Sequence, residues 1–349
     1  MKIPYNDLSR IHEPLKQSFH DALDKVLDTC GFVGDTKFAE EFKKYTKSEH
    51  CVTCNSGTDA IYIAIKSLEL KPGSRIAVPA ISYAATAMAV VNAGHTPVFV
   101  DVDPQSGLML VDTVKDVDCV IPVHLYGQCV DVKKLLDLGV PIIEDCAQAH
   151  GALIDGKHVG NFGVIGCFSF YPGKNMGALG DAGACITNDE TLAIKMKQYA
   201  SLGSPKHNRY EHKTDGINSR MDGIQGLFLC EKMKHLDEWT NQRISLAERY
   251  QNGTEFPKRS KVGKDVYHVF YTLQQDREKY IKHMNDLGIQ TGIHYPYPLP
   301  ELECFSEYHI LCKNAIEFCK KCVSLPLFPQ MTDEELQFTL KSHTDFHLL

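Results

Sequence analysis

A lysine near the middle of the chain has the sequence surroundings of a nucleophile. Lys174 comes soon after an apolar run that is typical of a strand, residues 166–170, and a proline and a glycine narrow the turn before it. Several glycines follow and let a bulky group approach the backbone. A lysine amine forms a Schiff base with an aldehyde when its surroundings lower its pKa enough. A solvated surface lysine is the alternative interpretation of this residue.

An aspartate and a glutamine lie at the end of another buried run. Asp145 closely follows Ile142–Ile143, and Gln148 comes three positions later. A carboxylate there is costly unless it meets a cation, although Asp145 alone also resembles a helix N-cap. Together with Lys174, Asp145 predicts a site for pyridoxal 5′-phosphate (PLP). The lysine would bind the aldehyde, the aspartate would keep the pyridine nitrogen protonated, and Gln148 would bind the ring hydroxyl.

The phosphate of such a cofactor needs a cradle. Ser56, Gly57 and Thr58 lie between a predicted strand and a predicted helix, where backbone N–H groups point at an anion. An ordinary capped helix start is the alternative. Ser169 adds a hydroxyl from the neighbouring strand. Tyr83 follows the next strand and is a candidate to stack on the ring face, although a core aromatic is its default role.

Composition narrows the class of protein. The chain has 349 residues, is 43% hydrophobic and 23% charged, and carries a net charge of −7 at pH 7. This balance argues against nucleic acid as the main ligand. No apolar run reaches the length of a membrane span, and the first residues lack a signal-peptide core, so we expect a cytoplasmic protein without membrane contact.

Cysteine usage fits the same compartment. Thirteen cysteines suit a reducing environment, where they behave as small hydrophobes. The pairs Cys51/Cys54 and Cys319/Cys322 have metal-type spacing. Neither has a nearby set of His or Cys partners, so we predict core thiols and no metal, with zinc as the alternative.

Short β-branched runs alternate with amphipathic stretches over about residues 50–190. This alternation predicts an α/β fold with a mostly parallel central sheet covered by helices on both faces. The pattern changes after residue 236 to a charged helix, an extended segment and a further helix. We therefore predict a large PLP-binding domain over residues 10–236 and a smaller C-terminal α+β domain over residues 237–349. We expect residues 1–9 to pack nearby.

Eight motifs in one order identify the chain as resembling the DegT family of PLP-dependent sugar-nucleotide aminotransferases. They are NSGTDA at 55–60, PVFVDVD at 97–103, PVHLYG at 122–127, EDCAQAHG at 144–151, SFYPGKN with GALGDAGA at 169–184, GINSRMD at 216–222, HYP at 294–296 and SLP at 324–326. The resemblance covers nearly the whole chain.

The resemblance implies PLP-dependent transferase fold type I, which is aspartate-aminotransferase-like. It assigns the Schiff base to Lys174, the ring nitrogen to Asp145 and the ring hydroxyl to Gln148. It assigns the contacts to the cofactor phosphate to Gly57, Thr58 and Ser169. In the family, the asparagine of the GxNxR segment reaches the cofactor of the other subunit, so Asn218 implies a homodimer with shared sites. A loop-capping role is the alternative for Asn218.

The resemblance also implies the substrates: L-glutamate as amino donor and a nucleotide-linked ketosugar as acceptor. Tyr171 and GALGDAGA around the lysine are similar to the branch that aminates the third carbon of dTDP-linked 6-deoxyhexoses. Pro300 stands where that branch often has histidine, and GIQG at 223–226 departs from its usual run. Amination of the fourth carbon, or a UDP-sugar, is the alternative.

Three further residues are candidates for the substrate. His294 and Tyr295 would contact the sugar, with ordinary structural roles as the alternative. Arg209, with Lys206 and His207, forms a basic loop that would meet the nucleotide diphosphate, unless it is simply solvated.

Three other functions compete with the transaminase. Dehydratases of this fold usually replace the lysine by histidine, and Lys174 counts against one. The intact Lys174, Asp145 and Gln148 count against a PLP-binding protein without turnover. No strand is followed by GxGxxG, which disfavours a dinucleotide-dependent oxidoreductase.

Overall fold

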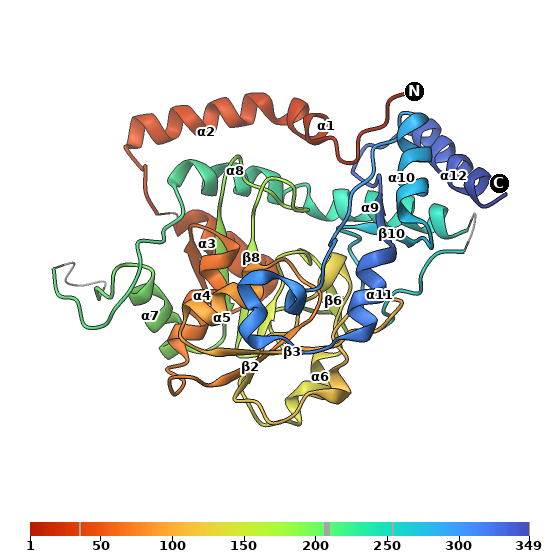
Figure 1. The fold of residues 1–349 in the computed structure, drawn as a ribbon. Helices are drawn as coiled ribbons and strands as arrows, with labels where there is room; N and C mark the ends of the chain where they lie inside the picture. Colours follow the sequence, from red (N-terminus) through yellow and green to blue (C-terminus); the bar gives the residue numbers. More distant parts are fainter. Residues whose placement is uncertain (35, 206–209, 253–254, 349) are drawn as a thin grey trace.

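The computed structural model describes residues 1–34, 36–205, 210–252 and 255–348, and its centre is a β-sheet flanked by helices (Figure 1). The strands are β1 (His50–Cys54), β2 (Arg75–Pro79), β3 (Thr96–Val100), β4 (Cys119–Val120), β5 (Ile143–Asp145), β6 (Leu153–Ile154), β7 (Lys157–His158), β8 (Ile165–Ser169), β9 (Gly183–Thr187), β10 (Phe270–Leu273) and β11 (Cys322–Leu325).

Helices precede, connect and follow these strands. The α-helices are α1 (Leu8–His12), α2 (Lys16–Thr29), α3 (Thr36–Thr46), α4 (Gly57–Ser67), α5 (Ala85–Asn92), α6 (Val132–Leu136), α7 (Glu190–Tyr199), α8 (Gly223–Met233), α9 (Leu236–Gln251), α10 (Arg277–Asp286), α11 (Lys313–Lys321) and α12 (Asp333–Leu348). Short 3₁₀ turns are η1 (Glu13–Leu15), η2 (Val111–Thr113), η3 (Leu125–Gly127), η4 (Leu299–Glu301) and η5 (Glu303–Tyr308).

The central sheet is mostly parallel, as the alternating pattern predicts. Strands β3, β2 and β4 pair in parallel, and so do β5 and β8. Single parallel bridges from Val120 to Ile142 and from Val123 to Asp145 join the two groups. The strand order is therefore β3-β2-β4-β5-β8-β9-β1. Within the described residues, β9 is the one strand of this sheet that runs in the opposite direction to the others.

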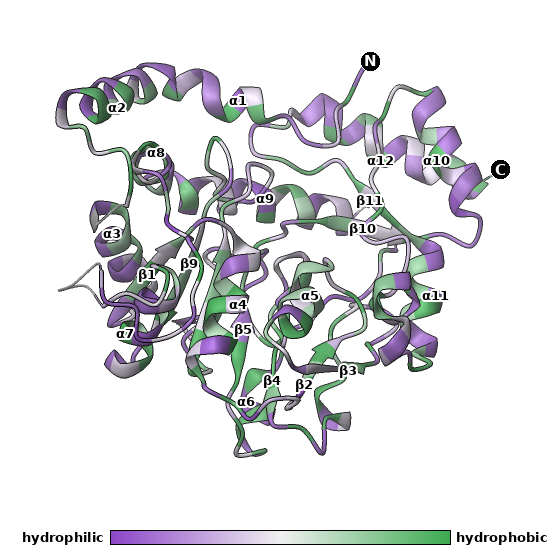
Figure 2. Cartoon of the chain, turned by 60° about the vertical axis from the view of Figure 1, so that its left-hand side comes forward, coloured by the Kyte–Doolittle hydropathy of each residue, from purple (hydrophilic) through white to green (hydrophobic). Residues whose placement is uncertain are grey.

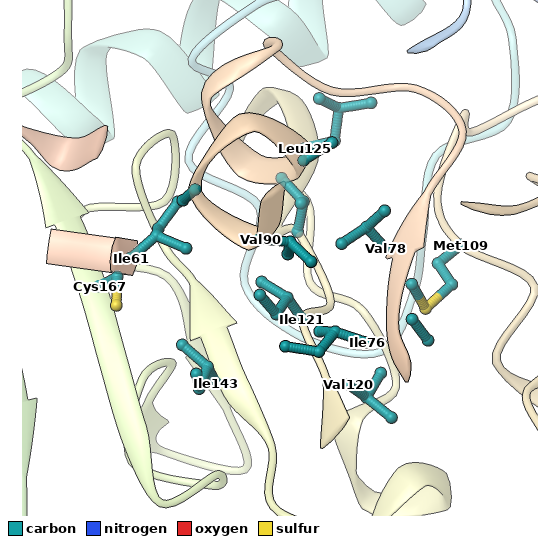
Figure 3. Close-up of a cluster of buried hydrophobic side chains, with 14 of the residues drawn as sticks. Ile61, Ile76, Val78, Val90, Met109, Val120, Ile121, Leu125, Ile143 and Cys167 are labelled. Carbon is teal, nitrogen blue, oxygen red and sulfur yellow. The ribbon is translucent and has the colours of Figure 1, made fainter. Parts of the chain in front are cut away.

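The main core lies on both faces of this sheet. Apolar side chains from β2, β4 and β5 meet those from α4 and α5, among them Ile76, Ile121, Ile143, Ile61 and Val90 (Figure 3). Each of these side chains is at most 3% exposed. Figure 2 shows the central strands and α5 as mainly hydrophobic and α10 as largely hydrophilic. Burial of this apolar surface is the main force that holds the strand ends in register.

A separate hydrophobic cluster forms around β10 and β11. It joins Phe270 and Val323 from these strands to Tyr280 of α10, Leu336 of α12 and Ile3 near the N-terminus. Ile3 also pairs with Ile289 through a parallel bridge. Helix α11, by contrast, contributes to the main core. The division at residues 236 and 237 stays a prediction.

The N-terminal helices α1 and α2 lie along α8 at the edge of the molecule (Figure 1). Their apolar residues, including Ile11, Leu15 and Phe19, pack on Phe228 and Trp239. Among the helices in the described ranges, none has the length and apolar character that crossing a membrane requires.

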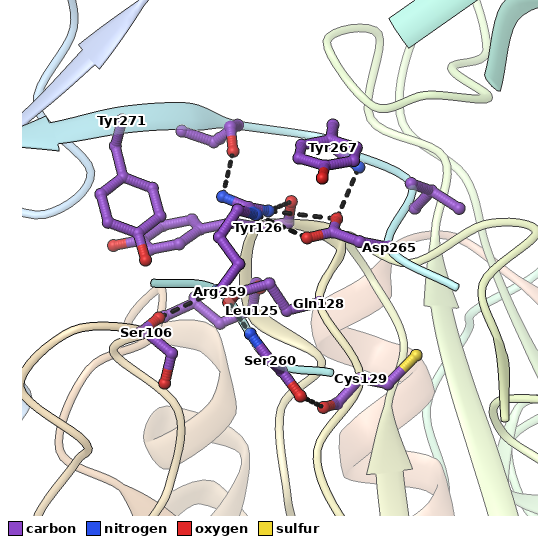
Figure 4. A network of polar contacts seen from close by, with 12 residues as sticks. Ser106, Leu125, Tyr126, Gln128, Cys129, Arg259, Ser260, Asp265, Tyr267 and Tyr271 are labelled. Atoms are coloured by element: carbon purple, nitrogen blue, oxygen red, sulfur yellow. Dashed lines mark hydrogen bonds and ion pairs between the residues drawn. The ribbon is translucent and has the colours of Figure 1, made fainter. Parts of the chain in front are cut away.

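A buried polar network ties the segment before β10 to the turn after β4 (Figure 4). Arg259 forms an ion pair with both carboxylate oxygens of Asp265, at 2.5 and 3.1 Å. Arg259 also donates to the carbonyl oxygens of Tyr126 and Val269, each at 3.1 Å. The guanidinium group lies over the ring of Tyr267, 4.7 Å from its centroid. All the polar groups of this pair therefore have partners.

Replacing Arg259 with leucine should destabilise the protein by about 3–5 kcal/mol, because Asp265 is left as a buried charge without its cation. The side chains of Arg259 and Asp265 are only 6% and 8% exposed. Chemical denaturation measures the loss. The matched control is Lys258→Leu at the exposed neighbouring position, which should change little. If the two variants unfold at the same denaturant concentration, the network does not stabilise the fold.

Candidate active site

Two adjacent parallel strands end next to each other at the centre of the sheet. β5 ends at Asp145 and β8 ends at Ser169, and Asp145 pairs in register with Cys167. Ligands of open α/β sheets bind beyond the carboxyl ends of the strands. The turn that carries Lys174 leaves β8 at this same edge. The structure therefore brings the predicted lysine and aspartate to one place.

The Asp145 carboxylate is buried and held by two hydrogen bonds. Thr86 Oγ1 donates to Oδ2 at 2.8 Å, and the Ala147 backbone N–H donates to Oδ1 at 3.1 Å. Burial raises the pKa of Asp145, while both hydrogen bonds and the Lys174 charge oppose the shift. This carboxylate, 3% exposed, gains from a cationic partner, because its charge has lost most of its hydration.

The turn that carries Lys174 has a fixed backbone. The Lys174 N–H donates to Tyr171 O at 2.9 Å, and the Ala178 N–H donates to Phe170 O at 2.7 Å. Burial lowers the pKa of Lys174 to about 8, and the nearby Asp145 carboxylate opposes that shift. At pH 7 about one lysine in ten is then an uncharged, nucleophilic amine. The role of Lys174 as the nucleophile stays a prediction.

The residues of the predicted phosphate cradle lie at the start of α4. Ser56 caps the helix, with its Oγ accepting from the Asp59 N–H at 3.1 Å. Gly57 and Thr58 occupy the first turn, where backbone N–H groups lack partners within the helix. Gly57 packs directly on Ser169, since a Cβ at Gly57 would lie 2.5 Å from Ser169 Cβ. The N-terminus of α4 and the Ser169 side chain therefore lie against each other.

Gly57→Ala should weaken PLP binding by at least about tenfold, because the added methyl group forces α4 and Ser169 apart. Titration of cofactor-free protein with PLP measures the change. The double variant Gly57→Ala/Ser169→Gly removes the two shortest contacts of the added methyl group and should recover part of the affinity, and Ser169→Gly alone accounts for the lost hydroxyl. If Gly57→Ala binds PLP like the unchanged protein, this approach of helix and strand does not form the cradle.

Gln148 is buried between two tyrosines. Its Oε1 accepts from the Tyr126 N–H at 2.7 Å, and its Nε2 donates to the Tyr295 hydroxyl at 3.0 Å. The second N–H of the Nε2 group is thus the one left to donate to a ligand. Tyr83, in contrast, is 63% exposed, and its ring lies 6.2 Å from that of Tyr295. Tyr83 therefore borders the site from its open side.

The remaining predicted residues fall in three different places. His294 is half-buried, with Nδ1 at 2.8 Å from Ser324 Oγ and its ring stacked on Tyr5 at 5.4 Å. Burial and the Lys174 charge lower the pKa of His294 to about 4, so it is neutral beside the lysine. Asn218 is exposed, and its Oδ1 accepts from Arg220 Nε at 3.1 Å. Arg209 lies outside the described residues.

Two histidines near Lys174 were missed by the sequence reasoning. His150 is 1% exposed between Phe168 and Phe170, and neither ring nitrogen has a hydrogen-bond partner within the described residues. Burial and Lys174 lower its pKa to about 3. His268 bonds Asn175 Oδ1 through Nδ1 at 3.1 Å, and its pKa is also far below its usual value because of burial and Lys174. Both are therefore neutral at physiological pH.

One group of metal-binding residue types lies behind the site. The ligand atoms of His124, Glu144 and Cys146 are within 4.8 Å of one another. Glu144 accepts from His124 Nε2 at 3.0 Å and from the N–H groups of residues 160, 162 and 163. His124 Nδ1 accepts from the Val130 N–H at 3.1 Å. The His124 and Glu144 side chains are thus already hydrogen-bonded, and they stabilise the loops around Asp145.

The sequence profile of the DegT/DnrJ/EryC1/StrS aminotransferase family matches residues 14–342. The chain belongs to this family. It is 35% identical to a UDP-N-acetyl-3-dehydro-α-D-glucosamine 3-aminotransferase of Acidithiobacillus ferrooxidans, over 96% of this chain and 95% of that protein. It is 33% identical to a dTDP-3-amino-3,4,6-trideoxy-α-D-glucose transaminase of Streptomyces venezuelae, over 95% and 92%. A "pleiotropic regulatory protein" of Geobacillus stearothermophilus is 35% identical over 99% of both chains.

Solved structures give the same fold for this DegT-family protein. DesV of S. venezuelae, in complex with a ketimine intermediate, superposes with a TM-score of 0.94 at 31% identity, covering 99% of this chain and 98% of that one. NtdA of Bacillus subtilis, with bound PMP, gives 0.89 at 28% identity, covering 99% and 85%. The DegT-family chain is thus a PLP-dependent sugar aminotransferase of fold type I, as the motifs predict.

The site fits this cofactor. The Lys174 amine suits the cofactor aldehyde. The buried Asp145 carboxylate suits the ring nitrogen, and the helix start at Gly57, with Ser169, suits the phosphate. When bound, PLP supplies an aldehyde and an electron-withdrawing ring. The protein supplies the groups that bind, orient and transfer protons.

Proposed function

We propose that this DegT-family aminotransferase moves an amino group from L-glutamate to the third carbon of a dTDP-linked 3-keto-6-deoxyhexose. The observation that carries the chemistry is the half-buried Lys174 amine, with a pKa of about 8, beside the buried Asp145 carboxylate. Three relatives support amination of the third carbon, since they are named transaminases of dTDP-3-amino sugars, at 32–33% identity. Tyr171 and the glycine-rich run after Lys174 favour the same branch.

In this proposal Lys174 would hold the cofactor through its aldehyde. When it is not engaged in that bond, the Lys174 amine would serve as the base that removes the proton from the donor α-carbon. Burial is what favours the uncharged state of Lys174. His150, His268 and His294 stay neutral beside it, because burial and the Lys174 charge lower their pKa values. The same amine returns the proton in the second half of the reaction.

The other cofactor contacts follow from the site geometry. We propose that Asp145 keeps the ring nitrogen protonated and that Gln148 donates its free N–H to the ring hydroxyl. Gly57, Thr58 and Ser169, with the Ser56 cap, hold the phosphate.

Two expected features concern the open side of the site. Asn218 is exposed, as a residue that reaches the cofactor of a second subunit must be, which supports an obligate homodimer. Tyr83 is exposed and lies beside Tyr295, with the two ring centroids 6.2 Å apart. We propose that Tyr83 stacks on the cofactor ring and that His294, Tyr295 and Arg209 bind the nucleotide sugar.

A second acceptor has its own support. A relative that is 35% identical acts by name on a UDP-linked 3-dehydro-N-acetylglucosamine, and one that is 29% identical on a UDP-linked 3-oxo-glucuronate. Both of these reactions also concern the third carbon. A UDP-linked 3-ketosugar is therefore the alternative acceptor.

Mass spectrometry with labelled donor tests the proposal. Holoprotein is incubated with L-[¹⁵N]glutamate and, separately, a dTDP-linked and a UDP-linked 3-ketosugar. We expect ¹⁵N in the dTDP-amino sugar and an equal amount of 2-oxoglutarate, with neither formed by Lys174→Ala. Label in the UDP-sugar alone would select the alternative. If glutamate is converted but no sugar is labelled, the acceptor class is wrong, and if glutamate is not converted, the donor is wrong.

A further inference from the structure

Lys232 is a buried cation on α8, away from the predicted contacts of the cofactor. Its side chain is only 1% exposed, and burial lowers its pKa to about 8. Within the described residues, no carboxylate forms an ion pair with it. A buried charge without a counter-ion is costly, and a methionine would fill the same space without that cost. Such a departure from ordinary core composition is typical of functional positions.

The ammonium group of Lys232 joins two distant segments of the chain. It donates to Gly177 O at 2.5 Å and lies 2.7 Å from His12 Nε2. An ammonium group has no lone pair, so His12 Nε2 must be the acceptor and the imidazole proton must sit on Nδ1. The ring of Phe19 lies below the ammonium at 5.9 Å. Burial and the Lys232 charge lower the pKa of His12 to about 4, which keeps this acceptor available.

Gly177 belongs to the turn that carries Lys174. A Cβ at Gly177 would lie 2.2 Å from Pro172 O, so the two ends of the segment 172–177 touch. The next residue, Ala178, closes the turn with a 2.7 Å hydrogen bond to Phe170 O. A displacement of the Gly177 carbonyl therefore displaces the whole segment on which Lys174 stands.

We propose that Lys232 is a positioning residue for Lys174. Through Gly177 O it holds the turn 172–177 closed, and His12 anchors the ammonium from the N-terminal helix α1. The N-terminal helices thus support the active site as well as covering α8. The proposal depends on the amine at residue 174 and not on which donor or sugar the enzyme uses.

The test compares Lys232→Met with Lys234→Met, an exposed lysine two positions away that pairs with Glu231. In cofactor-free protein, reductive methylation of residue 174 is followed against pH by peptide mass spectrometry. We expect Lys232→Met to move the midpoint from about 8 toward the ordinary 10.5, because the loosened turn lets water reach the amine. A rise of about half a pH unit in this midpoint lowers the fraction of uncharged Lys174 at pH 7 by roughly threefold. The visible band that forms on adding PLP should appear correspondingly more slowly, whereas Lys234→Met should match the unchanged protein.

A second pair of variants tests the anchor at His12. His12→Gln keeps an acceptor and should behave like the unchanged protein, whereas His12→Leu should shift the Lys174 midpoint in the same direction as Lys232→Met. If Lys232→Met does not fold, this pair decides the outcome. A folded Lys232→Met with an unchanged midpoint and rate overturns the proposal. Equal behaviour of His12→Leu and His12→Gln overturns the role of His12.

Discussion

Lys174→Ala will lose the visible absorption band of the PLP-bound protein and will lower kcat by at least about 10³-fold. The reason is that one side chain serves twice, as the amine that binds the aldehyde and as the base that moves the proton. Absorption spectra and steady-state rates measure the two effects. Lys174→Arg is the matched control: it keeps the charge near Asp145, but its guanidinium group is never a free nucleophile. Arginine at this position should therefore be as inactive as alanine.

The pH dependence of PLP binding gives a sharper test of the same lysine. With a pKa of about 8, the uncharged fraction rises about tenfold from pH 6 to pH 7 and levels off above pH 8. The rate of band formation should follow this curve, because the amine is the attacking species. A rate that keeps rising to pH 10 would mean that Lys174 is an ordinary solvated lysine, and it would contradict the site described above.

The positions of the residues proposed to bind the cofactor could be predicted from local sequence, because each lies at or just after the end of a strand. Asp145 and Ser169 end buried strands, and the parallel arrangement of β5 and β8 necessarily brings such ends together. Gly57 begins a helix directly after a strand, which is again a local pattern. To predict residues of this kind, one needs only the rule that ligands bind beyond the carboxyl ends of parallel strands.

The histidines around Lys174 could not be predicted in the same way. His268 reaches the site because the segment before β10 packs on the turn after β4, where a Cβ at Gly127 would lie 2.8 Å from His268 N. That contact joins residues far apart in sequence, and no periodic pattern encodes it. The signal that was available for His150 was its place in the EDCAQAHG motif, but its type alone does not distinguish a core histidine from a site histidine.

The burial of Lys232 and the direction of strand β9 also could not be predicted from the sequence, because both depend on how other parts of the chain pack. A lysine in a helix is normally exposed, but Lys232 is buried between His12 and Phe19 of the N-terminal helices and the segment that contains Gly177. The direction of β9 depends on the long turn that follows β8, which carries Lys174 and returns the chain to the next position of the sheet. The turn that reverses the strand is thus the turn that presents the amine.

Asp145→Asn should lower kcat by about 10²–10³-fold while PLP still binds, because the amide cannot hold a proton on the ring nitrogen by its charge. The variant should fold. The asparagine oxygen still accepts from the Ala147 N–H. The asparagine NH₂ group can donate to Thr86 Oγ1. The Thr86 hydroxyl then donates to Ser82 Oγ, which lies 2.8 Å away. Single-turnover rates and PLP titration separate the two effects. Normal turnover in a PLP-loaded Asp145→Asn would remove the carboxylate from the mechanism.

Thr86→Val is a milder change than Asp145→Asn, because it removes one hydrogen bond from the Asp145 carboxylate and keeps its charge. The bond from Thr86 lowers the pKa of Asp145. Its loss therefore raises that pKa, and activity, which needs the ionised carboxylate, should fail at a higher pH as the solution is acidified. At neutral pH the loss should be smaller than in Asp145→Asn. If the activity of Thr86→Val falls at the same acidic pH as that of the unchanged protein, the pH dependence belongs to another group. Asp145 would then act through geometry alone.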